Sequence, residues 1–171
     1  MKDHYNVLFL CTGNSARSQM AEALAKSLGR NRLRAFSAGS HPKGEVHPIA
    51  LQVLKSAGIS TEGLRSKSWD EFAGPDAPEM DLIITVCDRA AGEQCPVWPG
   101  HPLTAHWSLP DPAHATGTHE QVQKAFTNAM HALQQRISLL LSLPLEGLDR
   151  LAAQTRLHRI NENSATTDFH L

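Results

Sequence analysis

Residues 5 to 18 read YNVLFLCTGNSARS, and this stretch decides how the chain begins to fold. The apolar run from Tyr5 to Leu10 has the length of one buried strand. Five small or turn-forming residues follow Cys11, and after Arg17 apolar residues recur at helical spacing until Gly29, a typical helix stop. The stretch therefore predicts a strand, a short loop and a helix, with a thiol at the carboxyl end of the strand.

The rest of the chain continues this alternation of short apolar runs and amphipathic segments. Further strands are predicted at 33–37, 82–86 and 103–107, and further helices at 48–57, 68–71 and 118–142. We predict an α/β fold, a small doubly wound sheet of four parallel strands with helices on both faces. Residues 1–148 are expected to form the domain, and residues 149–171 a partly helical or disordered C-terminal extension.

Composition excludes several classes of function. The 171 residues carry 16 Lys plus Arg and 17 Asp plus Glu, so the net charge of −1 offers no basic surface for nucleic acid or membranes. The start MKDHYNVLFL does not resemble a signal peptide, and no apolar run has the length of a membrane span. We expect a monomeric cytoplasmic protein, whose three cysteines serve chemistry rather than structure.

The loop after the first strand has the composition of an oxyanion cradle. Cys11 would face a helix N-terminus, where free amides and the helix dipole favour an anion and lower the pKa of a thiol. The amides of TGNSA can turn inward, Arg17 can bind two oxygens at once, and Ser18 can donate to the thiolate. Asn14 tolerates left-handed geometry and would fix the shape of the loop. The alternative is that Cys11 is only a small core residue.

A resemblance to a known family rests on these residues and on three further segments. CTGNSARS resembles the catalytic loop of the low-molecular-weight tyrosine phosphatase superfamily. FSAGSHPKGEVHPIALQVLKSAGI, DLIITVCD and HWSLPDPA resemble segments of the arsenate reductases built on that fold, over about residues 5–148. The resemblance implies that Cys11 is the nucleophile and Asp111 the acid on a mobile loop. It implies an oxyanion site formed by Thr12, Gly13, Asn14, Ser15, Ala16, Arg17 and Ser18.

The loop that carries Asp111 supports its role as an acid independently. SLPDPA follows a predicted strand, and a general acid belongs on a loop that can close over the cradle. The alternative is a structural Asp at a turn or a helix N-cap.

Two further cysteines separate a reductase from a phosphatase, which needs no second thiol. Cys87 follows the strand LIITV and should emerge at the same edge of a parallel sheet as Cys11. We expect arsenate reduction, in which Cys87 attacks the loaded Cys11 and Cys95 carries the disulfide outward. The resemblance implies thioredoxin as electron donor, with glutathione and glutaredoxin used by related enzymes. The alternatives are that Cys87 is a buried strand-end thiol and Cys95 a bystander, and that the protein is a low-molecular-weight tyrosine phosphatase.

Two other possibilities concern metal ions. A remote alternative is a metal-binding module of Cys87, Cys95, His101 and His106, although their spacing matches no strong zinc pattern. We expect no tightly bound cofactor and no metal in the reaction. Similarity to related reductases suggests a structural potassium ion near Asn14, Glu22 and Ser37, whereas a buried polar cluster that stiffens the loop fits the same residues. Histidines near turns and helix starts, such as His47, are expected to be solvated or to cap helices.

Overall fold

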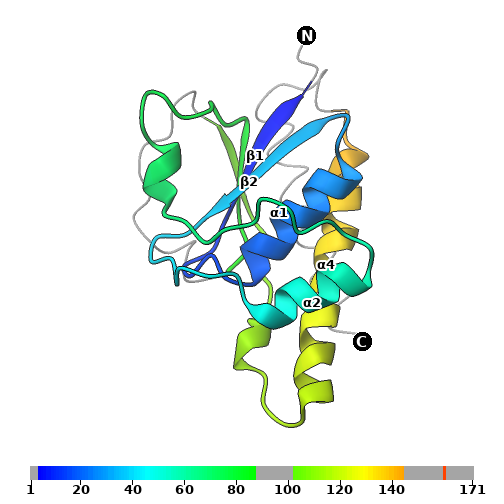
Figure 1. The fold of residues 1–171 in the computed structure, drawn as a ribbon. Coiled ribbons are helices and arrows are strands. Elements are labelled where there is room, and N and C mark those ends of the chain that lie inside the picture. The colour runs from blue at the N-terminus through cyan, green and yellow to red at the C-terminus, as the bar shows by residue number, and fades with distance from the viewer. Residues whose placement is uncertain (1–3, 88–101, 145–159, 161–171) are drawn as a thin grey trace.

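A computed structural model describes residues 4–87 and 102–144, together with Ile160. Strands and helices alternate along these residues, as the first view of the chain shows (Figure 1). The strands are β1 (Tyr5–Leu10), β2 (Leu33–Ala38), β3 (Leu82–Thr85) and β4 (Leu103–His106). The α-helices are α1 (Arg17–Leu28), α2 (Pro48–Ser56) and α4 (His119–Leu141), and the 3₁₀ helices are η1 (Trp69–Phe72) and η2 (Pro112–His114).

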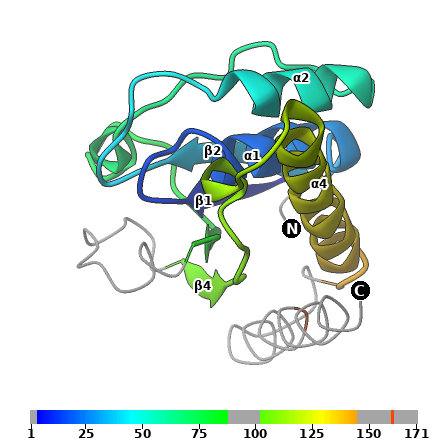
Figure 2. The same cartoon turned by 90° about the horizontal axis from the view of Figure 1, so that it is seen from below.

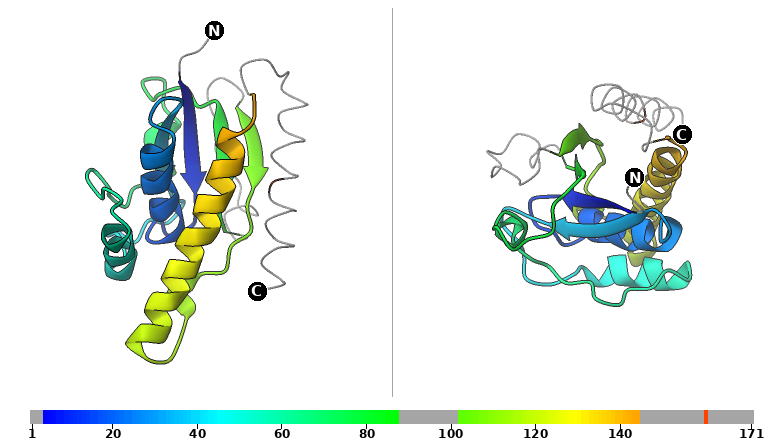
Figure 3. Two further views of the ribbon diagram at one scale, coloured as in Figure 1. Left: turned by 90° about the vertical axis from the view of Figure 1, so that its right-hand side faces the viewer. Right: turned by 90° about the horizontal axis from the view of Figure 1, so that it is seen from above.

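The four strands form one parallel sheet in the order β2-β1-β3-β4. In the central register Leu10 pairs with Ala38 of β2 and with Thr85 of β3, and Thr85 pairs with His106 of β4. All carboxyl ends therefore lie at one edge of the sheet, where ligands of doubly wound folds bind. The side view shows the strands running in the same direction beside α4 (Figure 3).

Alternation along β1 divides the core between the two faces of the sheet. Val7 and Phe9 point to the main core, which α1 and α4 cover, whereas Leu8 and Leu10 point to a smaller core with Phe72 of η1. Helix α2 packs outside α1 and α4, as the view from below shows (Figure 2). The predicted fold is confirmed. Among the described residues, however, all three α-helices lie on one face, and the helix of the opposite face is the 3₁₀ helix η1.

The predicted helix ends agree with the capping chemistry. Helix α1 ends before Gly29, and His47 caps α2 through its ring Nδ1, which accepts a hydrogen bond from the Ile49 amide at 3.1 Å. Thr118 and Gln121 form the capping box of α4.

Strand ends and one short helix differ slightly from the predictions. β2 extends to Ala38, while β3 and β4 each end one residue early, at Thr85 and His106. The next residues, Val86 and Trp107, still donate one backbone hydrogen bond each to a neighbouring strand. The segment SWDE forms 3₁₀ rather than α-helical turns, with Ser68 as its N-cap.

The C-terminal boundary predicted at residue 148 falls outside the described residues. Ile160 is described, is 6% exposed and belongs to the main core. Ile160, which lies in the region predicted as an extension, is thus part of the packed core. Within the described part of the chain, no helix combines the length and apolarity needed to cross a membrane.

Candidate active site at the carboxyl edge of the sheet

Two thiols meet at the carboxyl edge of the sheet. Cys11 follows β1 and Cys87 follows β3, and because these strands are neighbours the two thiols lie close together. Both cysteines are unoxidised and buried, with exposed fractions of 6% and 3%. The amide of Thr12 also donates to Cys87 Sγ at 3.4 Å. The prediction that Cys87 emerges beside Cys11 is confirmed.

The loop after Cys11 is held by its carbonyl groups. The oxygens of Thr12, Gly13 and Ser15 accept hydrogen bonds from the amides of residues 41, 43 and 47, at 2.9 to 3.0 Å. In a planar trans peptide the following N–H points the opposite way, so the amides of residues 13, 14 and 16 face away from the 41–47 segment. Helix α1 then begins at Arg17, and its N-cap Ala16 contributes no side-chain cap to the first amides.

Asn14 fixes the shape of this loop. Its backbone is left-handed, with φ of 44°, and its side chain is fully buried. The amide nitrogen Nδ2 donates to Ser18 Oγ at 2.8 Å and to Ser37 Oγ at 3.0 Å. Its Oδ1 accepts from Gln19 Nε2 and from the amide of Lys67, each at 2.9 Å. All four polar positions of the side chain are therefore used, as the expected role in shaping the loop requires. The expected donation from Ser18 to Cys11 stays a prediction.

Arg17 connects the loop to the segment that carries Asp111. Its Nη1 donates to the carbonyl of Leu109 at 2.8 Å, and its Nη2 lies 3.5 Å from Asp111 Oδ2. Buried Arg136 of α4 holds the neighbouring carbonyl, because its Nη1 donates to Ser108 O at 2.6 Å. Two arginines thus donate hydrogen bonds to consecutive carbonyls, those of Ser108 and Leu109, in the segment between β4 and Asp111.

Asp111 caps a short helix and lies beside Arg17, while its role as the acid stays a prediction. Its Oδ1 accepts from the amide of Ala113 at 3.0 Å, so it caps η2, as the structural interpretation predicted. Its Oδ2 faces both Arg17 and the imidazole of His114, each at 3.5 Å. The carboxylate therefore lies at the cradle while its loop geometry is fixed by the cap.

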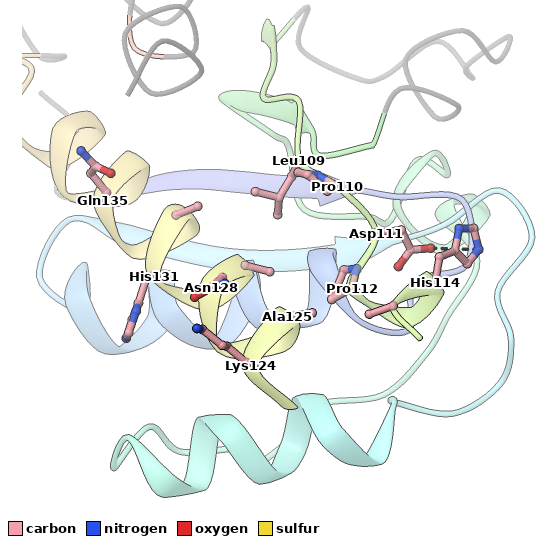
Figure 4. Close-up of a pocket in the computed structure, with 13 residues that line it drawn as sticks. Leu109, Pro110, Asp111, Pro112, His114, Lys124, Ala125, Asn128, His131 and Gln135 are labelled. Atoms are coloured by element: carbon pink, nitrogen blue, oxygen red, sulfur yellow. Dashed lines mark ion pairs between the residues drawn. The ribbon is translucent and has the colours of Figure 1, made fainter. Parts of the chain in front are cut away.

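A groove of about 820 Å³ adjoins this acid loop (Figure 4). Leu109 to Pro112 line one side, and α4 lines the other with Lys124, Asn128, His131 and Gln135. Asp111 and His114 lie together at one end of the groove, joined by the ion pair drawn in Figure 4. Asp111 thus borders a groove rather than a flat surface.

The pKa of Cys11 departs from the expectation. The loop and Arg17 were expected to lower it, but the hydrogen bond with Cys87 and burial raise the pKa of this thiol well above its ordinary value. Arg17 opposes these effects, and the nearby Asp111 adds to them. The sequence pattern indicated the cation and placed Cys87 nearby, but it did not indicate that Cys87 favours the thiol form of Cys11.

A buried chain of polar groups lies behind the loop. Ser37 Oγ donates to Glu22 Oε1 at 2.7 Å, and the same oxygen lies 3.4 Å from Lys67 Nζ. The exposed fractions of the Lys67 and Glu22 side chains are only 6% and 3%. Burial lowers the pKa of the Lys67 ammonium, and Glu22 opposes that shift. On the outer side, Lys26 Nζ lies 2.6 Å from Glu22 Oε2.

These contacts bear on the potassium ion suggested near Asn14, Glu22 and Ser37. The Lys67 ammonium already supplies a positive charge to Glu22 Oε1 and also donates to the carbonyl of Arg65 at 2.9 Å. Oxygens that would ligate a cation are therefore used by an internal ammonium group. The residues present fit a buried polar cluster, the other interpretation considered, and do not fit a bound potassium ion.

Several residues of the site were not predicted from the sequence, and some residues that were predicted fall outside the described part of the chain. Gln19 and Lys67 hold Asn14 in place, but nothing in the sequence pattern distinguishes them from surface residues. Arg136 could have been found, because it lies three residues after Leu133 and four before Leu140 on the buried stripe of α4. Cys95 and His101 fall outside the described residues. Within the described part, no group of three or more metal-ligating side chains comes together.

Comparison with protein families agrees with this geometry. A model described as low molecular weight phosphotyrosine protein phosphatase matches residues 6–154. The match includes the loop after Cys11, both described cysteines and the loop that carries Asp111. The chain belongs to the low molecular weight phosphotyrosine protein phosphatase family.

Individual relatives place the chain more narrowly. The arsenate reductase of Bacillus licheniformis is 38% identical over 132 residues, which are 77% of this chain and 91% of that protein. A solved arsenate reductase in the phosphate-binding state has a TM-score of 0.66 and 29% identity, covering 81% of this chain and 97% of the other. The thioredoxin-dependent arsenate reductase of Corynebacterium glutamicum has a TM-score of 0.54 and 25% identity, covering 81% and 64%. Within its family, the chain is a member of the arsenate reductase branch.

Proposed function

We propose that this protein reduces arsenate to arsenite, with Cys11 as nucleophile and Cys87 as the thiol that completes the reduction. The observation that carries the proposal is the closeness of the Cys11 and Cys87 thiols at the edge of the sheet. Hydrolysis of a phosphocysteine needs water as the second nucleophile, whereas reduction of arsenic(V) needs a second thiol beside the first. The similarity to arsenate reductases supports the same choice.

The first step forms a bond between sulfur and arsenic. The Cys11 proton passes to an oxygen of dianionic arsenate, which overcomes the preference of the buried thiol for its neutral form. The thiolate then attacks arsenic and an As–O bond breaks. Asp111 acts here in its protonated form, gives the leaving hydroxide the proton that makes it water, and is left as the carboxylate that faces Arg17. Arg17 and the loop amides offset the charge on the remaining oxygens.

The second step moves two electrons. Cys87, as thiolate, attacks the sulfur of Cys11 and forms a disulfide bond, and the electron pair of the S–As bond stays on arsenic. Arsenic(V) becomes arsenic(III) and leaves as arsenite, while the two sulfurs are oxidised together by two electrons. The Thr12 amide that donates to Cys87 Sγ stabilises negative charge on that sulfur.

The cycle closes by disulfide exchange. In the proposal Cys95 attacks Cys87, releases the Cys11 thiolate and leaves a Cys87–Cys95 disulfide, which an external dithiol reduces. Thioredoxin is the proposed donor because a relative is described as thioredoxin-dependent, and glutaredoxin with glutathione is the competing donor. The proposal places a monomer in the cytoplasm, where thiols stay reduced, and takes residues 1–148 as the catalytic unit.

The test is arsenate-dependent oxidation of NADPH with thioredoxin and thioredoxin reductase. We expect multiple turnover by the parent, loss of all activity in Cys11→Ser, and at most one turnover in Cys87→Ser and Cys95→Ser. Replacing the thioredoxin system with glutathione, glutaredoxin and glutathione reductase decides the donor. Sustained turnover by Cys87→Ser would disprove the relay. Brisk hydrolysis of p-nitrophenyl phosphate by a parent that ignores arsenate would make the protein a phosphatase.

A further inference from the structure

We propose that Lys67 is a positioning residue of the active-site loop. Its buried ammonium is an internal cation that keeps the side chains of Glu22, Ser37 and Asn14 in their hydrogen-bonded positions. Its role concerns any oxyanion that the loop binds, so the inference does not depend on whether arsenate is the substrate.

The contacts form a closed ring through Lys67. From its side chain the ring runs to Glu22 Oε1 at 3.4 Å, which accepts from Ser37 Oγ at 2.7 Å. Ser37 Oγ in turn accepts from Asn14 Nδ2 at 3.0 Å. Asn14 Oδ1 closes the ring by accepting the backbone amide of Lys67 at 2.9 Å. A single residue therefore contacts both ends of the chain that shapes the loop.

The ring depends on the charges of the Lys67 ammonium and the Glu22 carboxylate. Glu22 is almost fully buried, and a buried carboxylate is costly unless a cation or hydrogen-bond donors compensate it. If Glu22 turns outward toward Lys26, Ser37 loses the acceptor that orients its hydroxyl. Asn14 then loses a partner at the one non-glycine position with positive φ among the described residues. The ammonium of Lys67 is thus linked to the loop conformation through two side chains.

The chain itself provides a matched control. Lys26 also pairs with Glu22, at 2.6 Å, but its side chain is 44% exposed and lies on the outer side of the carboxylate. An exposed ion pair contributes little, because water replaces the lost cation. Comparing substitutions of the two lysines therefore tests whether any positive charge near Glu22 is sufficient, or whether that charge must be buried.

The experiment compares Lys67→Ser with Lys26→Ser in two salts of equal ionic strength, potassium chloride and choline chloride. Thermal unfolding is measured for each, together with the affinity for inorganic phosphate by titration calorimetry at a temperature where every variant is folded. In choline chloride we expect Lys67→Ser to melt about 6 to 12 °C lower and to bind phosphate about tenfold more weakly. Lys26→Ser should stay within about 2 °C of the parent.

Compensation by charge is the decisive readout, since a merely structural lysine would not show it. Potassium, which carries the same charge, should restore most of the melting temperature and phosphate affinity of Lys67→Ser, while the parent responds equally to both salts. The double variant Lys67→Ser/Glu22→Gln, which removes the buried charge, should melt higher than Lys67→Ser and lose its response to potassium.

Three results would overturn the inference: unchanged phosphate affinity in Lys67→Ser, a loss that neither potassium nor Glu22→Gln restores, or an equal loss in Lys26→Ser. None of these measurements uses arsenate turnover. Failure of arsenate reduction and failure of the role of Lys67 are therefore told apart.

Discussion

Gly39 packs directly against the backbone of the active-site loop. A Cβ atom built there would lie 2.4 Å from the carbonyl oxygen of Thr12 and 2.5 Å from that of Cys11. Both obstacles are backbone atoms of the loop, so no side chain can rotate away. To reach 3.0 Å from the nearer oxygen, the backbone must retreat by about 0.6 Å. Gly39→Ala should therefore displace the loop that holds the nucleophile.

The expected magnitude follows from that displacement. Overpacking of this kind costs about 1 to 3 kcal/mol. In a domain of this size the cost lowers the melting temperature by about 2 to 12 °C. The effect on catalysis should be larger than the effect on stability, because misplacement by about 1 Å can reduce rates by about a hundredfold. We expect kcat/KM for arsenate in the thioredoxin-coupled assay to fall by about tenfold to a hundredfold.

Gly74→Ala is the control, because a Cβ there meets no atom within 4 Å. Removing this glycine from a loop should leave activity unchanged and raise stability by as much as about 1 kcal/mol. Thermal unfolding and the coupled assay are run on both variants and the parent. The reasoning would be refuted by a Gly39→Ala protein that melts within about 1 °C of the parent and keeps full activity. Equal losses in both variants would show instead that glycine itself, and not the close approach, is what matters.

Two further predictions concern titration. In a Cys95→Ser background, Cys87→Ala should shift the pH profile of Cys11 alkylation by iodoacetamide to lower pH. The reason is that the hydrogen bond with Cys87 raises the pKa of Cys11. A profile that stays in place or moves to higher pH would contradict this. Burial lowers the pKa of His47, so the unfolded chain takes up its proton first and stability falls as the pH drops below about 6.5. His47→Asn, which keeps a capping side chain without a titrating ring, should show a smaller fall in the urea midpoint between pH 7.5 and 5.5. An equal fall in both proteins would assign the pH dependence to other groups.

Much of the fold could be predicted because its signals are local. Capping residues such as Thr118 lie where the helical spacing begins, and the continuous apolar run of β3 is typical of a strand buried on both faces. The parallel arrangement then follows from the alternation of strands and helices, and it places the ends of β1 and β3 at one edge. The proximity of Cys11 and Cys87 could be predicted for that reason.

The features that could not be predicted depend on long-range contacts between single atoms. The spacing of Cys11 and Arg17 indicates a cation near the thiol, but not that the Cys87 sulfur shares a hydrogen bond that raises the pKa. Lys67 stands between two serines in a polar stretch, where a lysine is normally solvated. Only the folded chain brings it to Glu22, a residue 45 positions away.

The order of the strands has a consequence for the two sulfurs. Neighbouring strands lie about 4.8 Å apart, which falls within the range of about 4.4 to 6.8 Å between the Cα atoms of a disulfide. Because β1 and β3 are adjacent, residues at their ends start at a spacing that a covalent bridge tolerates. A single strand inserted between them would roughly double that spacing and put it beyond reach. The capacity to join these two side chains therefore belongs to the topology of the sheet itself, and loop sequences can diverge without removing it.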